Sequence, residues 1–183
     1  MRDRTMPIVV SGLAMLLLPG VAAVPVRPDW TEPQAATKAV AVLMPTTGSS
    51  VRGLVRFEAV QGGIIIQARV EGLPAGDHGF HIHELGDCSA TDGTSAGGHY
   101  NPTDAPHAGP GAAQRHVGDL GNITADAQGT ATLDRVDGVV QLSGPQSVIG
   151  RSVIVHAGAD DLTTQPTGAA GGRLACGVIG IAR

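Results

Sequence analysis

The feature that most constrains the fold is the absence of any long helical pattern after residue 30. Short β-branched or alternating runs stand there instead, such as VRGLVRFEAV, GGIIIQARV and RSVIVH, and glycine, proline and aspartate separate them. Such runs are typical of strands, and turn residues between them favour a sandwich or barrel. We therefore expect an all-β fold with strands near residues 37–43, 51–57, 63–70, 79–83, 118–124, 129–133, 147–156 and 174–181.

Composition supports one domain of this kind. The chain has 183 residues with 27 glycines and 12 prolines, and only 2% of its residues are aromatic. The core must therefore be built from aliphatic side chains, with many turns and few long helices. The net charge of −4 gives no indication of a nucleic-acid or anionic-membrane surface.

The first residues differ from the rest. Arg2 and Arg4 precede an uncharged, mostly apolar run, Ile8–Leu18, and small residues follow at positions 21–23. This order is typical of a secretory signal peptide over residues 1–23, because the run is too short to span a bilayer. The alternative is a buried N-terminal helix.

Export predicts a periplasmic or extracellular protein in an oxidising compartment, with no membrane attachment after signal cleavage. One disulfide there would use both cysteines of the chain, Cys88 and Cys176. We expect residues 24–36 to form a lead-in to a single domain over residues 37–183.

Two histidines stand two positions apart in GFHIHELGDC. On a strand, His81 and His83 point to the same face, whereas Ile82 points to the other. Paired imidazoles are suited to copper or zinc. Two partly buried histidines with ordinary hydrogen bonds are the alternative.

A long segment downstream carries further ligand types, namely His99, His107, His116 and Asp119. It is rich in proline and glycine and poor in core-forming side chains, so burial of apolar surface cannot order it. A metal held by three histidines and one carboxylate would order it, and that closed set is the structural zinc pattern. Histidines scattered on a flexible loop are the alternative.

His156 ends another apolar run and could join His81 and His83. Three imidazoles with a fourth from the loop form a nitrogen-rich site without cysteine, which suits Cu(II). The chain has seven histidines, and His78 faces away from His81 on a strand. One of the other six would then have to serve both metals, since a deprotonated imidazole can bridge two cations.

The stretches HGFHIHELGD, SAGGHYNP, RHVGDLGNITAD, SVIGRSVIVHAGADDL and GGRLACGVIGIA resemble the copper-zinc superoxide dismutase family. The resemblance implies an eight-stranded Greek-key β-barrel, an immunoglobulin-like sandwich with two long functional loops. It implies copper ligands at His81, His83, His99 and His156. It implies zinc ligands at His99, His107, His116 and Asp119, with His99 as the bridge between the metals.

The same resemblance implies roles around the metals. Asp160 would link one copper-ligand histidine to one zinc-ligand histidine, and Arg173 would guide the anion to copper. Cys88 and Cys176 would form the disulfide, and His78 would be structural. The implied activity is dismutation of superoxide to dioxygen and hydrogen peroxide, by alternate reduction and oxidation of bound copper with the His99 bridge taking up and returning a proton.

The position of Cys88, eleven residues before His99, resembles bacterial members of the family, whereas HVGDLGNI and GVIGIA resemble eukaryotic ones. The segments SVIG and GVIGIA resemble the face of the eukaryotic-type homodimer and favour that assembly, with Leu85 and Gly86 nearby. A different face or a monomer, as in bacterial relatives, is the alternative. Lys38 is the only lysine of the sequence, so the attraction of an anion rests on few basic residues. An exported copper store on the same barrel and a metal-free adhesive sandwich are the competing hypotheses.

Overall fold

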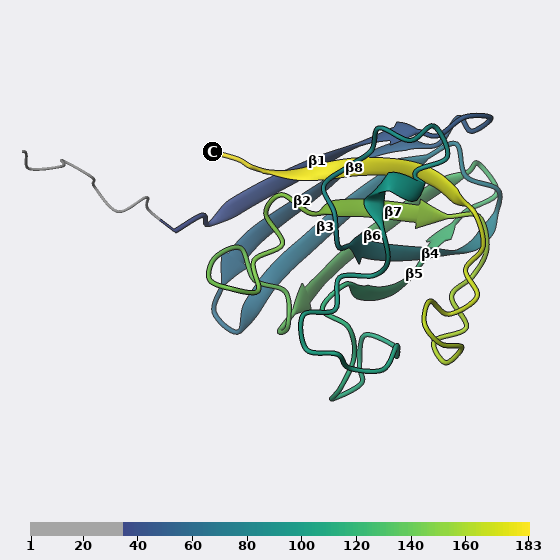
Figure 1. Ribbon diagram of the computed structural model, residues 1–183. Coiled ribbons are helices and arrows are strands. Elements are labelled where there is room, and N and C mark those ends of the chain that lie inside the picture. The colour runs from purple at the N-terminus through teal and green to yellow at the C-terminus, as the bar shows by residue number, and fades with distance from the viewer. Residues whose placement is uncertain (1–34) are drawn as a thin grey trace, which may run out of the picture. The chain divides into compact units, whose positions relative to one another are not determined.

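The computed structural model describes residues 35–183, which form a closed barrel of eight antiparallel strands (Figure 1). The predicted signal peptide over residues 1–23 and most of the lead-in lie outside the described residues. The strands, in chain order, are β1 (Lys38–Pro45), β2 (Arg52–Val60), β3 (Gly63–Glu71), β4 (Gly76–His83), β5 (Asp119–Ala125), β6 (Thr130–Asp137), β7 (Ser152–His156) and β8 (Arg173–Ile181). They pair in the order β1-β2-β3-β6-β5-β4-β7-β8, and β8 closes the barrel against β1.

The period-2 pattern of the sequence places the core. In β3, Ile64, Ile66 and Val70 are buried while Gln67 and Arg69 are exposed, as alternation on a half-buried strand requires. Two phenylalanines and mostly aliphatic side chains fill the barrel, as the composition predicts. Burial of each large aliphatic or aromatic side chain contributes roughly 1.5–3 kcal/mol.

Each predicted strand has an observed counterpart, and the clearest difference is at the start of β7. The expected strand over residues 147–156 begins only at Ser152. The amide of Arg151 bonds the carbonyl of Val148 at 3.0 Å, and Gly150 has a φ of 80°. A turn therefore occupies the start of the β-branched run, because a positive φ does not fit a strand.

Two long connections build the site. Residues 84–118, which include the short 3-10 helix η1 (Thr94–Ala96), join β4 to β5, and residues 157–172 join β7 to β8 (Figure 1). Both pack on β4, because His83 pairs with His99 and the amide of Gly79 bonds the carbonyl of Gly158 at 2.9 Å. Between residues 35 and 183, no helix has the length and apolar character needed to cross a membrane.

Candidate metal centre

Strand β4 carries a core face and a histidine face. Phe80 and Ile82 point into the barrel core, and His81 and His83 lie on the other face, where the long connections bury them almost completely. The alternation predicted from the sequence is therefore correct. His78 lies apart from both, and its two ring nitrogens are hydrogen-bonded to the carbonyls of Pro74 and His156, each at 2.9 Å.

Four histidines form the first cluster. One nitrogen from each of His81, His83, His99 and His156 lies within 4.8 Å of the others. The Nε2 atoms of His83 and His156 are 3.3 Å apart, and the rings of His81 and His99 have centroids 4.0 Å apart. Two cluster nitrogens, Nδ1 of His81 and Nε2 of His99, are buried with no hydrogen-bond partner among the described residues.

The outer nitrogens of three of these rings have fixed partners. His81 Nε2 lies 2.8 Å from Asp160 Oδ2, and Nδ1 of His83 lies 2.9 Å from the carbonyl of Gly97. His156 Nδ1 lies 3.2 Å from the carbonyl of Gly171. When the outer nitrogens donate to these oxygens, the inner nitrogens present their lone pairs to one another.

Asp119 organises the second cluster. Its Oδ1 atom lies 2.8 Å from Nδ1 of His99, 2.9 Å from Nδ1 of His107 and 3.0 Å from Nδ1 of His116. Its Oδ2 atom accepts the amides of Ala108 and His116 at 3.1 and 3.0 Å. Three nitrogens and one carboxylate oxygen thus lie within 4.8 Å of one another, which is the donor set of a closed zinc site.

Two residues connect the clusters. His99 turns Nδ1 toward Asp119 and Nε2 toward the first cluster, so one imidazole belongs to both sets. Asp160 holds Nε2 of His81 through Oδ2 and Nε2 of His107 through Oδ1, at 2.8 and 2.9 Å. The position of Asp160 is fixed in turn by Asn122, whose side-chain amide bonds its backbone N–H and C=O, both at 2.8 Å.

The protonation states fit metal binding. Burial lowers the pKa of His81 to about 4 and that of His156 to about 3, and it lowers the pKa of His83 well below its usual value. Burial alone would raise the pKa of Asp119, but hydrogen bonds from His99, Ala108 and His107 hold it well below its usual range. His81, His83 and His156 are therefore neutral imidazoles and Asp119 is a carboxylate at neutral pH, which are the forms that bind cations.

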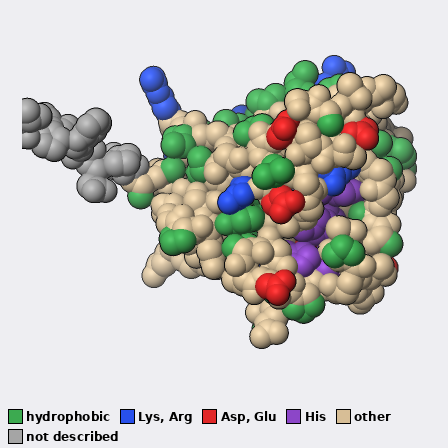
Figure 2. All heavy atoms as spheres, in the orientation of Figure 1, with side chains coloured by type: hydrophobic (Ala, Val, Ile, Leu, Met, Phe, Trp, Pro, Cys, Tyr) green, Lys and Arg blue, Asp and Glu red, His purple; other side chains and the backbone are tan. Residues whose placement is uncertain are grey.

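Arg173 lies beside the first cluster. Its guanidinium donates to the carbonyls of Gly93 and Gly97, both at 2.6 Å, so the loop after β4 fixes its position. The carbonyl of Gly97 also bonds Nδ1 of His83 at 2.9 Å, which places the guanidinium beside the cluster, and its charge adds to burial in lowering the pKa values of His83 and His156. Figure 2 shows histidine side chains at the bottom of a hollow, with a basic side chain next to them.

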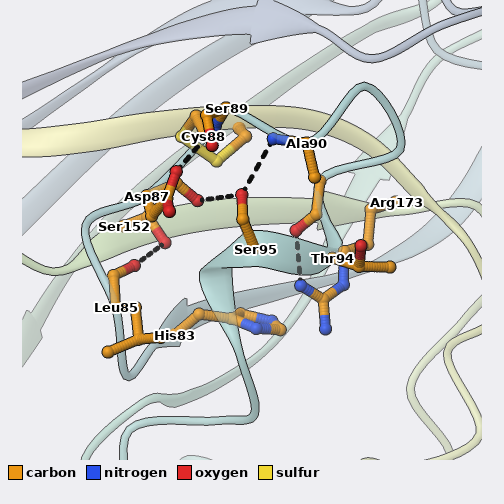
Figure 3. Close-up of a disulfide and its surroundings, with 12 residues drawn as sticks. His83, Leu85, Asp87, Cys88, Ser89, Ala90, Thr94, Ser95, Ser152 and Arg173 are labelled. Carbon is orange, nitrogen blue, oxygen red and sulfur yellow. Dashed lines mark hydrogen bonds between the residues drawn. A yellow bond between two sulfur atoms is a disulfide. The ribbon is translucent and has the colours of Figure 1, made fainter.

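The disulfide ties the same loop to β8. Cys88 is bonded to Cys176, as the sequence predicts, with Cα atoms 5.8 Å apart. Beside it, the hydroxyl of Ser95 donates to the carbonyl of Asp87 at 2.8 Å and accepts the amide of Ala90 at 3.0 Å (Figure 3). The disulfide therefore links the loop that supplies both carbonyl acceptors for Arg173 to β8, the strand that begins at Arg173.

All residues predicted for the site are brought together, and sequence reasoning missed some of those that support them. Buried Arg115 donates to the carbonyls of His116 and Asp119 at 2.9 and 3.1 Å and pairs with Asp137 at 2.6 Å. Its position next to a predicted ligand was the available signal. The carbonyl of Gly97, which holds both His83 and Arg173, left no signal in the sequence because a backbone atom has no residue type.

Comparison with known proteins agrees with this geometry. Residues 51–179 match the sequence model of copper/zinc superoxide dismutase. The chain belongs to the copper/zinc superoxide dismutase family. It is 46% identical over 153 residues to an extracellular superoxide dismutase [Cu-Zn] of Brugia pahangi, covering 78% of this chain and 75% of that protein. It is 48% identical over 159 residues to an extracellular superoxide dismutase [Cu-Zn] of Onchocerca volvulus, covering 80% and 77%.

A solved structure agrees as well. The crystal structure of the clock protein EA4 superposes with a TM-score of 0.74 at 44% identity, covering 81% of this chain and 96% of that one. The predictions of the family, the eight-stranded barrel, and copper and zinc as cofactors are confirmed. The bacterial type stays a prediction.

Proposed function

We propose that this superoxide dismutase binds copper at His81, His83, His99 and His156, and zinc at His99, His107, His116 and Asp119. The observation that carries the proposal is His99, whose two ring nitrogens belong to two adjacent donor sets. The first set holds nitrogen atoms alone, which favours copper. The second adds one carboxylate to three imidazoles, which favours a closed zinc site.

The overall reaction consumes two superoxide ions and two protons, and it yields one dioxygen and one hydrogen peroxide. Copper, when bound, supplies the one-electron chemistry that side chains perform poorly. His99 holds and releases a proton at Nε2, the ring atom that lies in the first cluster without a hydrogen bond. Asp119 and Asp160 keep the neighbouring imidazoles oriented during this exchange.

Arg173 attracts the substrate. It supplies a fixed positive charge beside the first cluster, and its planar donors suit a small anion. Its two carbonyl bonds keep the guanidinium in place without neutralising it. The charge of Arg173 acts on His83 and His156, whose pKa values it helps to lower, so it would also attract an anion to the same cluster.

We propose that residues 1–23 are a secretory signal and residues 24–36 a lead-in, so the enzyme removes superoxide outside the cytoplasm. The names of the two relatives, both extracellular enzymes, and the disulfide support this. Amino-terminal sequencing of the secreted protein tests it, and a mature chain that still begins at Met1 would contradict it.

We further propose a homodimer of the eukaryotic-like type. Leu85, Val178 and Ile181 expose 49%, 44% and 70% of their surface. Val178 and Ile181 both belong to GVIGIA, the segment that resembles eukaryotic members of the family. Sedimentation at micromolar concentration tests the proposal. A monomer of mass near 18.4 kDa or less would contradict it.

Metal quantification combined with a superoxide assay tests the central proposal. The loaded protein should hold one copper and one zinc per chain and dismutate superoxide, and chelation should remove both metals and the activity. An exported copper store would bind copper without rapid dismutation. Full activity after complete metal removal would refute the proposal.

A further inference from the structure

Gln165, in the loop between β7 and β8, reaches across to the loop between β4 and β5. Its Oε1 atom accepts the backbone amide of His107 at 2.8 Å, and its Nε2 atom donates to the carbonyl of the same residue at 2.8 Å. A third bond joins Nε2 to the carbonyl of Thr163 at 3.1 Å. One side chain thus satisfies both polar backbone groups of a residue 58 positions away in the sequence.

The segment that carries Gln165 is held by its own hydrogen bonds. Asp161 Oδ1 accepts the amides of Thr163 and Thr164 at 3.0 and 2.8 Å. The amide of Gly168 bonds the carbonyl of Thr164 at 2.6 Å, and the amide of Asp161 bonds the carbonyl of Gly168 at 2.8 Å. Gln165 therefore projects from a closed turn and not from a loose loop.

Gly168 lets this turn lie directly against the metal centre. Its φ is 65°, and a Cβ atom at this position would overlap Oδ1 of Asp160 and lie 2.6 Å from Nε2 of His107. The two atoms of the hydrogen bond between Asp160 and His107 thus lie in the space that a side chain at position 168 would need. Any side chain at position 168 would force the turn away from His107.

We propose that Gln165 is a positioning residue for zinc, which fixes the backbone of His107 while Asp160 fixes its ring. This inference rests on the proposed assignment of His107 as a zinc ligand. The ring bond and the backbone bonds come from one loop, so His107 is held from both ends by residues 160–168. Removal of Gln165 leaves the ligand chemistry intact but frees the chain on which the ligand is mounted.

Gln165 is exposed in spite of these bonds, so truncation to alanine opens no cavity in the core. Loss of an outer partner of a metal ligand typically costs about 10–100-fold in metal affinity. We therefore expect Gln165→Ala to weaken zinc binding by about tenfold or more, and to release zinc faster to a chromophoric chelator. Gln165→Glu keeps the acceptor for the amide of His107 and loses the donor to its carbonyl. Its zinc affinity should therefore lie between that of the wild type and that of Gln165→Ala.

The matched control is Gln128→Ala, which removes the same amide from an exposed turn where the side chain makes no hydrogen bond to any described residue. Zinc affinity and zinc release are measured for the full secreted chain and each variant, together with copper content. The denaturation midpoint of the metal-free forms is also measured, because a merely structural role would lower it without a specific loss of zinc.

Three outcomes separate the hypotheses. Specific zinc loss in Gln165→Ala, with Gln128→Ala unchanged, supports the inference. Equal zinc affinity in wild type and Gln165→Ala overturns it and leaves the proposed function intact, provided that the wild type binds zinc and dismutates superoxide. A wild-type protein that binds no zinc refutes the assignment of His107 and the inference with it.

Discussion

The two ring nitrogens of a histidine have different roles in this molecule. His81, His83 and His156 each use one ring nitrogen for a fixed oxygen partner and turn the other into the first cluster. Asp119 accepts from three rings through a single oxygen atom. In His81, His83 and His156 the outer bond selects the tautomer, so the inner nitrogens are set for metal binding by groups outside both donor sets.

His156→Ala should abolish dismutation and leave zinc bound. Its Nε2 atom belongs to the first cluster, near Nε2 of His83, and takes no part in the second cluster around Asp119. Metal content by mass spectrometry, with a superoxide assay on the same sample, checks this. A variant that keeps full activity would refute the copper assignment, and one that also loses its zinc would show that the sites cannot be separated this way.

Arg173→Ala should lower kcat/KM roughly tenfold and weaken its dependence on ionic strength, because a fixed charge steers an anion less as salt screens it. Arg173→Lys keeps the charge and should retain more of the rate. Stopped-flow assays across ionic strength measure both variants. Metal content is the control, since the substitution also removes the bonds to Gly93 and Gly97; identical kinetics at every salt concentration would exclude a guiding role.

At the scale of elements, the strands are local properties of the sequence and the long connections are not. Alternation and β-branching indicated β3 correctly, because half-buried strands impose a period of two. The same criterion extended β7 back to residue 147, where Gly150 and the turn bond of Arg151 prevent a strand. No periodic pattern describes residues 84–118, which are ordered by specific bonds to β4, β8 and the other loop.

Reduction of the disulfide, or a Cys88→Ser and Cys176→Ser double variant, should lower thermal stability. The bond joins residues 88 positions apart, and cross-links over such lengths contribute about 2–5 kcal/mol. For a domain of this size the melting midpoint should fall by roughly 4–20 °C. Calorimetry of the metal-free protein with and without reductant measures it, and identical melting curves would refute a stabilising bridge.

At the scale of the whole molecule, the described residues form a closed barrel, and the site depends on contacts between parts distant in the sequence. The side chains of the two clusters could be predicted because histidine and aspartate types are visible in the chain, and the structure brings these side chains together. Of the partners that hold them, only Asp160 was expected, from the family resemblance. Gln165, Arg115 and the carbonyl of Gly97 were not, since they act through positions that only the folded chain brings together. The sequence therefore indicates which side chains are candidate ligands, while their orientation is a property of the fold.

Burying so many titratable groups makes the stability of the metal-free protein depend on pH. Burial lowers the pKa of His81 to about 4 and of His156 to about 3, from an ordinary value of 6.5. As pH falls below about 6.5, these groups therefore take up protons in the unfolded chain before they do so in the folded one. Each pKa unit of difference lowers the free energy of unfolding by ~1.4 kcal/mol once the pH is below the folded pKa. Burial lowers the pKa of His107, but Asp160 and Asp119 raise it by more. Protonation of His107 therefore stabilises the folded state as pH falls, against the effect of His81 and His156.

The metal-free protein should thus lose stability steadily from about pH 6.5 to pH 4, before most carboxylates are protonated. Urea denaturation midpoints across this range measure the loss. The metal-loaded protein is the control, and its midpoint should change less over the upper part of the range, because bound cations hold the same nitrogens deprotonated. A metal-free midpoint that is constant or rises between pH 6.5 and 4 would contradict the burial of neutral imidazoles as the main electrostatic cost of this fold.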